Sequence, residues 1–112
     1  MIIDEISMVA PDLLDAMDIL ARSARHNNAP FGGIQVVAIG DLFQLPPVIT
    51  RDAAEMYRQA YGHENAYFFD AHVAARCNFQ KFNFECVYRQ NDLPLLENLK
   101  RLRGGDLGAL EF

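Results

Sequence analysis

The residues best suited to chemistry are two adjacent acids, Asp4 and Glu5, which follow the apolar residues 1–3. Such an apolar run is typical of a buried strand, whose rigid end can hold one carboxylate against a Mg²⁺ ion. The ion would bridge the β- and γ-phosphates of a nucleotide, and the next acid could deprotonate the attacking water. The pair therefore fits nucleotide hydrolysis, although two acids at a strand end are by themselves more often a solvated turn.

A second candidate lies in the string GDLFQLPPV at residues 40–48. The amide of Gln44, on a loop at the carboxyl end of a strand, can hydrogen-bond a terminal phosphate. The rigid step Pro46-Pro47 can transmit a displacement of that loop to a neighbouring surface. A proline-bounded turn is the alternative, and it explains the prolines but not the whole string.

The third candidate is Arg89, in the string VYRQ at residues 87–90, which precedes a leucine-rich helix. An arginine where a loop meets a helix can act as an arginine finger on the γ-phosphate. Considered alone, Arg89 is more often a surface or ion-pairing residue.

The elements that must position these residues begin with a strand at residues 1–4 and a loop at 5–10. Pro11 suits the first position of a helix that ends near His26. Its expected apolar stripe consists of Leu13, Leu14, Met17, Leu20, Ala21 and Ala24. Its expected polar face holds Asp15, Asp18, Arg22 and Arg25.

Residues 34–39 (IQVVAI) are rich in β-branched residues and almost uniformly apolar, which predicts a central strand covered on both faces. Strand, helix and strand of this length predict a right-handed βαβ unit with parallel strands. Ligands bind beyond the carboxyl ends of such strands, so both acid-bearing loops are expected at one edge. Further along, we expect a helix at 51–61, a turn and short helix at 65–70, a strand at 81–86 and a helix at 93–102.

Composition and charge argue against several classes of protein. The 112 residues are 51% hydrophobic with a net charge of −5, which argues against nucleic-acid binding over the whole surface. A local basic patch remains in the last third. The spacing of Cys77 and Cys86 indicates neither a disulfide framework nor a zinc site, and the histidines are scattered. No apolar run approaches the roughly 20 residues of a membrane span.

Taken together, the motifs resemble the PIF branch of superfamily 1 helicases, relatives of the RecD motor. IIDEISMV at residues 2–9 is similar to the second family motif, and GDLFQLPPV to the third. DLLDAMDILARSAR at 12–25 and PFGGIQ at 30–35 resemble the signature segment between them. VYRQND at 87–92 resembles the fourth motif. The resemblance covers most of the chain and is weakest at residues 51–80.

The resemblance implies an α/β fold: a partial RecA-like P-loop NTPase domain with a parallel sheet, whose N-terminal P-loop strand and helix are missing. Residues 1–86 would be the C-terminal part of the first motor domain, and residues 87–112 the start of the second. The string GxxxxGK[ST] is absent from the 112 residues. Only three apolar residues precede the acids, and only a short segment follows Gly104-Gly105, which would end the last helix. Both ends are therefore expected to be cuts through a larger protein, with a natural short chain as the alternative. The chain alone is expected not to hydrolyse ATP.

The resemblance also assigns roles by position. Asp4 would hold Mg²⁺, Glu5 would be the general base, Gln44 would sense the γ-phosphate and Arg89 would reach it from the second motor domain. The substrate would be ATP.

The partner would be single-stranded DNA, unwound in the 5′-to-3′ direction during replication, repair or recombination. Arg22 and Arg25, with Pro46 and Pro47, are candidates for DNA contact. The alternative for Arg22 is an i,i+4 ion pair with Asp18. The place of action would be the nucleoid of a bacterium, or the nucleus or mitochondrion of a eukaryote. The rival functions are a P-loop ATPase outside the helicases and a truncated, non-enzymatic binding module.

Overall fold

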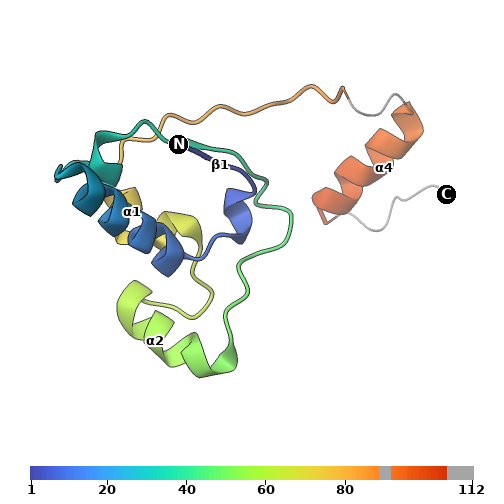
Figure 1. Ribbon diagram of the computed structural model, residues 1–112. Coiled ribbons are helices and arrows are strands. Elements are labelled where there is room, and N and C mark those ends of the chain that lie inside the picture. Colours follow the sequence, from blue (N-terminus) through green and yellow to red (C-terminus); the bar gives the residue numbers. More distant parts are fainter. Residues whose placement is uncertain (89–91, 106–112) are drawn as a thin grey trace. The chain divides into compact units, whose positions relative to one another are not determined.

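The computed structural model describes residues 1–88 and 92–105, and it divides into two compact units, Met1–Phe79 and Gln80–Phe112 (Figure 1). The first unit contains, in order, β1 (Ile2–Ile3), the 3₁₀ helix η1 (Ile6–Met8), α1 (Pro11–Arg25), η2 (Pro30–Gly33), β2 (Val37–Ala38), α2 (Arg51–Tyr61), η3 (Phe68–Asp70) and α3 (His72–Arg76). The described part of the second unit contains α4 (Leu93–Arg103).

The two strands pair in parallel, with Ile2 opposite Val37 and Ile3 opposite Ala38. The pairing continues on either side, because the Val37 N–H donates to Met1 O and the Ile39 N–H donates to Ile3 O, both at 2.9 Å. The α/β class, the strand–helix–strand order and the parallel sheet are thus confirmed.

Both strands are shorter than the sequence predicts, and the expectation that β2 is covered on both faces is wrong for the described residues. Val37, Ala38 and Ile39 are exposed. A strand is covered on both faces only when helices pack on each side of its sheet. The described residues supply β2 with one neighbouring strand, β1, which leaves its apolar side chains uncovered.

Helix α1 begins and ends as predicted, but its inward face differs from the predicted stripe. Leu13 and Leu20 are 54% and 68% exposed, whereas Leu14 is buried and Asp18 is only 3% exposed. The buried positions follow Pro11 at helical spacing. Hydrophobicity alone misplaces this face because Asp18 forms hydrogen bonds and ion pairs that compensate for its burial.

The core of the first unit joins α1 to η2, α3 and the first strand. It consists of Ile3, Ile6, Leu14, Phe31, Ala71 and Val73. In Figure 1, α1 lies beside the teal η2 segment and the yellow segment that carries α3. The segment after residue 65, where the sequence is least informative, therefore contributes to the same core as the strand that bears the acids.

An unusual turn links α1 to β2. Phe31 has φ 51° and ψ 31°, and Gly32 and Gly33 follow with φ 62° and 74°. A left-handed conformation is uncommon for a residue with a side chain. A Cβ on Gly32 would lie 2.6 Å from the carbonyl oxygen of Ala21, so only glycine allows the turn to approach α1 this closely.

The helices expected at 51–61 and 93–102 are confirmed, as is the turn and short helix within 65–70. The strand expected at 81–86 is wrong, because these residues form no strand and Phe84 is 92% exposed. Alternating side chains make a strand only where a partner strand accepts its hydrogen bonds. No described residue pairs with this segment.

Candidate active site

The turn after β1 holds the adjacent acids Asp4 and Glu5, and both are exposed. Glu5 adopts φ 51° and ψ 43°, its N–H donates to Asp4 Oδ1 at 2.9 Å, and its carbonyl accepts from the Met8 N–H at 3.0 Å. A non-glycine residue in this region of backbone space is unfavourable by roughly 1–2 kcal/mol. Such strain often accompanies functional sites, where the surrounding structure holds it in place.

The loop after β2 touches this turn directly. The Ile6 N–H donates to Ile39 O at 2.9 Å. A Cβ on Gly40 would lie 2.9 Å from Ile6 Cγ2 and 3.1 Å from the Ser7 backbone nitrogen. Gly40 therefore allows the backbones of the two loops to meet, and the acids that follow β1 and the acid that follows β2 lie on neighbouring loops.

Gln44 is tied to that second loop through Asp41. The Gln44 N–H donates to Asp41 O at 3.0 Å, and Gln44 Nε2 donates to Asp41 Oδ2 at 3.4 Å. The Phe43 N–H also donates to Asp41 Oδ1, at 3.0 Å. Gln44 and Pro46 are exposed and Pro47 is partly buried. The amide of Gln44 is thus displayed on a turn that Asp41 organises.

The donor set suits Mg²⁺ held through a nucleotide. Within residues 1–88 and 92–105, no three His, Cys, Asp or Glu side chains form a metal-binding cluster. Mg²⁺ keeps several waters and is usually bound by one or two carboxylates together with substrate phosphates. The exposed carboxylate of Asp4 fits that pattern, with the Glu5 carboxylate beside it.

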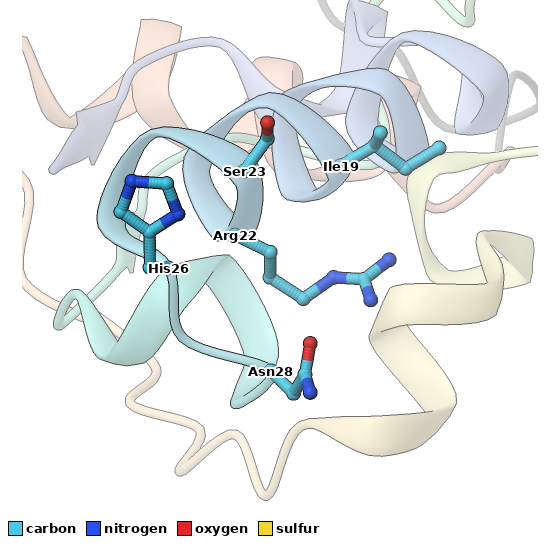
Figure 2. A pocket seen from close by; sticks show the side chains of 5 residues that line it. All are labelled: Ile19, Arg22, Ser23, His26 and Asn28. Carbon is cyan, nitrogen blue, oxygen red and sulfur yellow. The ribbon is translucent and has the colours of Figure 1, made fainter.

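The two arginines of α1 are engaged within the chain. Arg22 Nε lies 2.8 Å from Asp18 Oδ2, so the i,i+4 pair considered from sequence is present. Arg25 Nε donates to Gly32 O at 2.8 Å and steadies the left-handed turn. Arg22 lines an open hollow of about 430 Å³. Figure 2 shows its side chain among the other residues of that hollow. The lining of the hollow consists of Ile19, Arg22, Ser23, His26 and Asn28.

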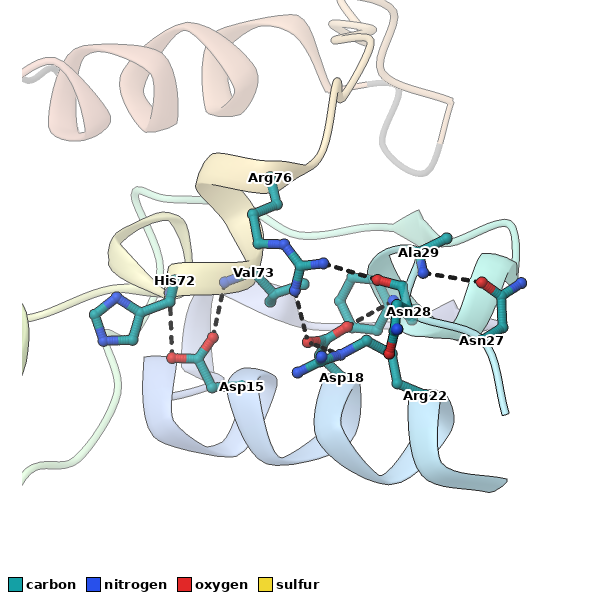
Figure 3. A network of polar contacts seen from close by, with 10 residues as sticks. Asp15, Asp18, Arg22, Asn27, Asn28, Ala29, His72, Val73 and Arg76 are labelled. Carbon is teal, nitrogen blue, oxygen red and sulfur yellow. Dashed lines mark hydrogen bonds and ion pairs between the residues drawn. The ribbon is translucent and has the colours of Figure 1, made fainter. Parts of the chain in front are cut away.

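The acids of α1 organise the unit in a way that the sequence did not reveal (Figure 3). Asp15 Oδ1 accepts from the Val73 N–H at 2.8 Å, and Asp15 Oδ2 accepts from the His72 N–H at 3.1 Å. The Tyr61 hydroxyl donates to the same Oδ2 at 3.2 Å. The only sequence signal is two acids three residues apart on a helix, which the helical pattern assigns to its solvated face.

Asp18 is the buried centre of the same network. Its Oδ1 accepts from the Phe31 N–H at 2.7 Å, and its Oδ2 also lies 3.5 Å from Arg76 Nη1. Arg76 Nη2 in turn donates to Asn28 O at 2.9 Å. One carboxylate therefore connects α1, the left-handed turn and α3.

Among the described residues, the environment raises the pKa of two tyrosines and one cysteine. Burial raises the pKa of Tyr61 to about 12, with a further rise from the Asp15 carboxylate. Burial and a hydrogen bond to Asp12 raise the pKa of Tyr57 as well. Burial, with the Asp18 charge, raises the pKa of the Cys77 thiol, which disfavours the reactive thiolate.

Arg89, the candidate arginine finger, lies outside the described residues. Across residues 1–88 and 92–105, no helix is long and apolar enough to cross a membrane.

Comparisons with known proteins agree with the motifs. A family model described as PIF1-like helicase matches residues 1–82. The chain is 40% identical over 107 residues to the ATP-dependent DNA helicase RRM3 of Saccharomyces cerevisiae, and this match covers 96% of the chain and 14% of RRM3. It is 56% identical over 105 residues to the ATP-dependent DNA helicase PIF1 of Homo sapiens, which covers 94% of the chain and 15% of that protein.

Solved structures extend the agreement to three dimensions. The Bacteroides Pif1 helicase in complex with ADP-AlF3 and single-stranded DNA matches with a TM-score of 0.88 and 39% identity, over 95% of this chain and 24% of that chain. The Pif1 helicase of Candida albicans matches with a TM-score of 0.73 and 36% identity, over 91% and 21% of the two chains. The chain spans about a seventh of the length of yeast RRM3 and of human PIF1. It belongs to the PIF1-like helicase family.

Proposed function

We propose that this chain forms part of the motor core of an ATP-dependent DNA helicase, which couples ATP hydrolysis to 5′-to-3′ unwinding in replication, repair or recombination. The observation that carries the proposal is the contact between the two loops at Gly40. That contact lies between the turn of Asp4 and Glu5 and the loop that displays Gln44. The relatives named above are ATP-dependent DNA helicases.

Four residues have a role in the proposal. Asp4 holds Mg²⁺, which when bound offsets the negative charge of the phosphates. Glu5 accepts a proton from the water that attacks the γ-phosphorus. Gln44 hydrogen-bonds the γ-phosphate and moves its loop when the phosphate leaves. Arg89 belongs to a second motor domain that begins near residue 87, and it stabilises charge on the γ-phosphate as the domains close.

The phosphates need a further partner. A P-loop cradles them with backbone N–H groups and a lysine, and its string does not occur in residues 1–112. The 112-residue chain by itself is therefore proposed to be inactive, and hydrolysis is proposed for the complete helicase.

Single-stranded DNA is the proposed partner, by analogy with the Bacteroides complex. Arg22 and Arg25 are the candidate phosphate contacts, together with the surface at Pro46 and Pro47. The bonds to Asp18 and Gly32 each use Nε. An arginine has five N–H donors, so an intramolecular bond through one of them is compatible with a phosphate contact through another.

The test is Glu5→Gln in the complete helicase. This change keeps the side-chain size and removes the base, so DNA-stimulated ATP hydrolysis should fall by about 10²–10⁴-fold. Nucleotide binding, measured by equilibrium titration with a fluorescent ATP analogue, should be retained. Glu85→Gln, which alters an exposed glutamate in an extended segment, is the matched control and should leave turnover unchanged.

Unchanged turnover in Glu5→Gln would remove Glu5 from the role of base. A complete protein without any DNA-stimulated hydrolysis would contradict the proposed function and favour a non-enzymatic module. Arg89→Ala should abolish hydrolysis and leave DNA binding intact; normal turnover would instead assign Arg89 a structural role.

A further inference from the structure

Ser7 carries a hydroxyl that the fold described above does not use. It lies in η1, two residues after Glu5, and the residue is 1% exposed. Among the described residues, its Oγ is the buried side-chain atom that has no hydrogen-bond partner. Nearly all buried polar groups in native proteins are paired, and an unpaired one is unfavourable. An alanine at this position would avoid that cost, so the hydroxyl calls for a physical reason.

The surroundings of Ser7 join the two loops of the candidate active site. The Ser7 backbone nitrogen is 3.1 Å from the place that a Cβ on Gly40 would occupy. On its other side, η1 follows immediately from the left-handed Glu5. Ser7 therefore lies between the turn that holds the proposed base and the loop that carries Gln44.

We propose that Ser7 is a positioning residue for Glu5, whose hydroxyl forms its hydrogen bond with the backbone of residues 40–44 only when nucleotide is bound. A hydroxyl can both donate and accept, so either an N–H or a carbonyl of that loop can pair with it. Because Gly40 keeps the two backbones in contact, a small shift of the loop as Gln44 meets the γ-phosphate brings such a group within reach. The bond then fixes η1, and with it the direction of the Glu5 carboxylate.

This inference rests on the proposed function, and it makes the bond specific to the reacting state. An interaction raises kcat only when it favours the transition state over the bound ground state, and this bond does so by holding the Glu5 carboxylate in its reactive direction. The loss of Ser7 should therefore slow turnover without weakening the fold of the nucleotide-free protein.

The experiment uses the complete helicase with Ser7→Ala, Ser7→Cys and, as a control, Thr50→Ala. Thr50 is an exposed residue whose hydroxyl does not cap α2, so its removal should change nothing. For Ser7→Ala, kcat of DNA-stimulated ATP hydrolysis should fall by about tenfold, as is usual when a supporting contact is lost. KM for ATP should stay within about twofold. The thermal midpoint without nucleotide should be unchanged or higher, because no hydrogen bond is lost.

Ser7→Cys separates the hydroxyl from its volume. Cysteine is slightly larger than serine and leaves no cavity, but its thiol is a weak hydrogen-bonding group, so the loss of kcat should persist in this variant. Normal turnover in Ser7→Ala would overturn the inference, and so would a cysteine variant that restores full turnover, since the defect would then be a cavity. A lower midpoint in nucleotide-free Ser7→Ala would also overturn it, because the hydroxyl would already be bonded. A wild-type protein without hydrolysis would refute the proposed function, and this inference with it.

Discussion

Removing the carboxylate of Asp18 is the sharpest test of how the fold holds its signature helix. Asp18 is 3% exposed and has three partners: the Phe31 N–H at 2.7 Å, Arg22 Nε at 2.8 Å and Arg76 Nη1 at 3.5 Å. Asp18→Ala leaves the first partner without an acceptor inside the protein and leaves two guanidinium groups without their counter-charge.

The size of the effect follows from these contacts. An unpaired buried N–H costs about 1–3 kcal/mol, and a hydrogen bond to a charged group contributes about 1.5–3 kcal/mol. The second contribution is discounted, because the Arg22 and Arg76 side chains are 29% and 44% exposed and water can solvate them. We therefore expect Asp18→Ala to lower the free energy of unfolding by about 3 kcal/mol, the lower end for a broken buried pair.

Asp18→Asn separates the contribution of the negative charge from that of the hydrogen bond to Phe31. Its amide oxygen can still accept from Phe31, but the negative charge is gone, so the loss should be about half as large, near 1.5 kcal/mol. Arg22→Ala should cost about 1 kcal/mol or less, because the pair is partly exposed on that side.

Urea denaturation followed by tyrosine emission would measure these values, since the chain has four tyrosines and no tryptophan. Asp52→Asn, which alters an exposed acid at the start of α2, is the control and should change stability by less than about 0.5 kcal/mol. A loss below about 1 kcal/mol for Asp18→Ala would refute the reasoning, because the carboxylate would then be solvated and not the centre of a buried network.

Three further outcomes are expected. Gly32→Ala should lower the free energy of unfolding by about 3 kcal/mol, because φ is +62° and the new Cβ would lie 2.6 Å from a backbone oxygen. Gly62→Ala, with φ +88° and nothing within 4 Å, is the control and should lower it by about 1 kcal/mol in the same denaturation assay. Tyr61 has a folded pKa of about 12 against the ordinary tyrosine value of 10.0, so its contribution to stability should be complete below pH 10 and lost as pH rises toward 12. Tyr61→Phe should therefore reduce the decrease in the free energy of unfolding between pH 10 and 12. An unchanged dependence of stability on pH would contradict this assignment. Arg22→Gln in the complete helicase should weaken binding to single-stranded DNA of any sequence, and it should reduce the slope of log binding constant against log salt concentration by about 0.7. Arg51→Gln, which alters an exposed arginine, is the control. An unaltered slope would exclude a phosphate contact by Arg22.

The sequence by itself determined the chemistry and the principal elements. Acid residues at 4 and 5, the string at 40–48 and the helix from Pro11 were enough to predict an α/β fold with parallel strands and a helicase relative. These features are local, since Pro11 sets the start of its helix and glycine or acid residues follow each strand. Local signals of this kind are readable without knowledge of what packs against them.

The tertiary structure alone decided which face of α1 turns inward. The sequence placed Asp18 on the solvated face and Leu20 in the core, and both assignments were wrong. The reason is that burial of a carboxylate depends on partners far along the chain. Phe31 and Arg76 are these partners, and the periodicity of residues 11–25 contains no information about them.

The contact between the loops is likewise a tertiary result. Gly40 and Ser7 are 33 positions apart, and only the pairing of β1 with β2 brings them together. The alternation at 81–86 shows the converse, since a pattern typical of a strand remained extended and exposed where no described strand pairs with it. A strand is defined by its neighbour, whereas the acids of a strand end keep their chemistry wherever the sheet places them.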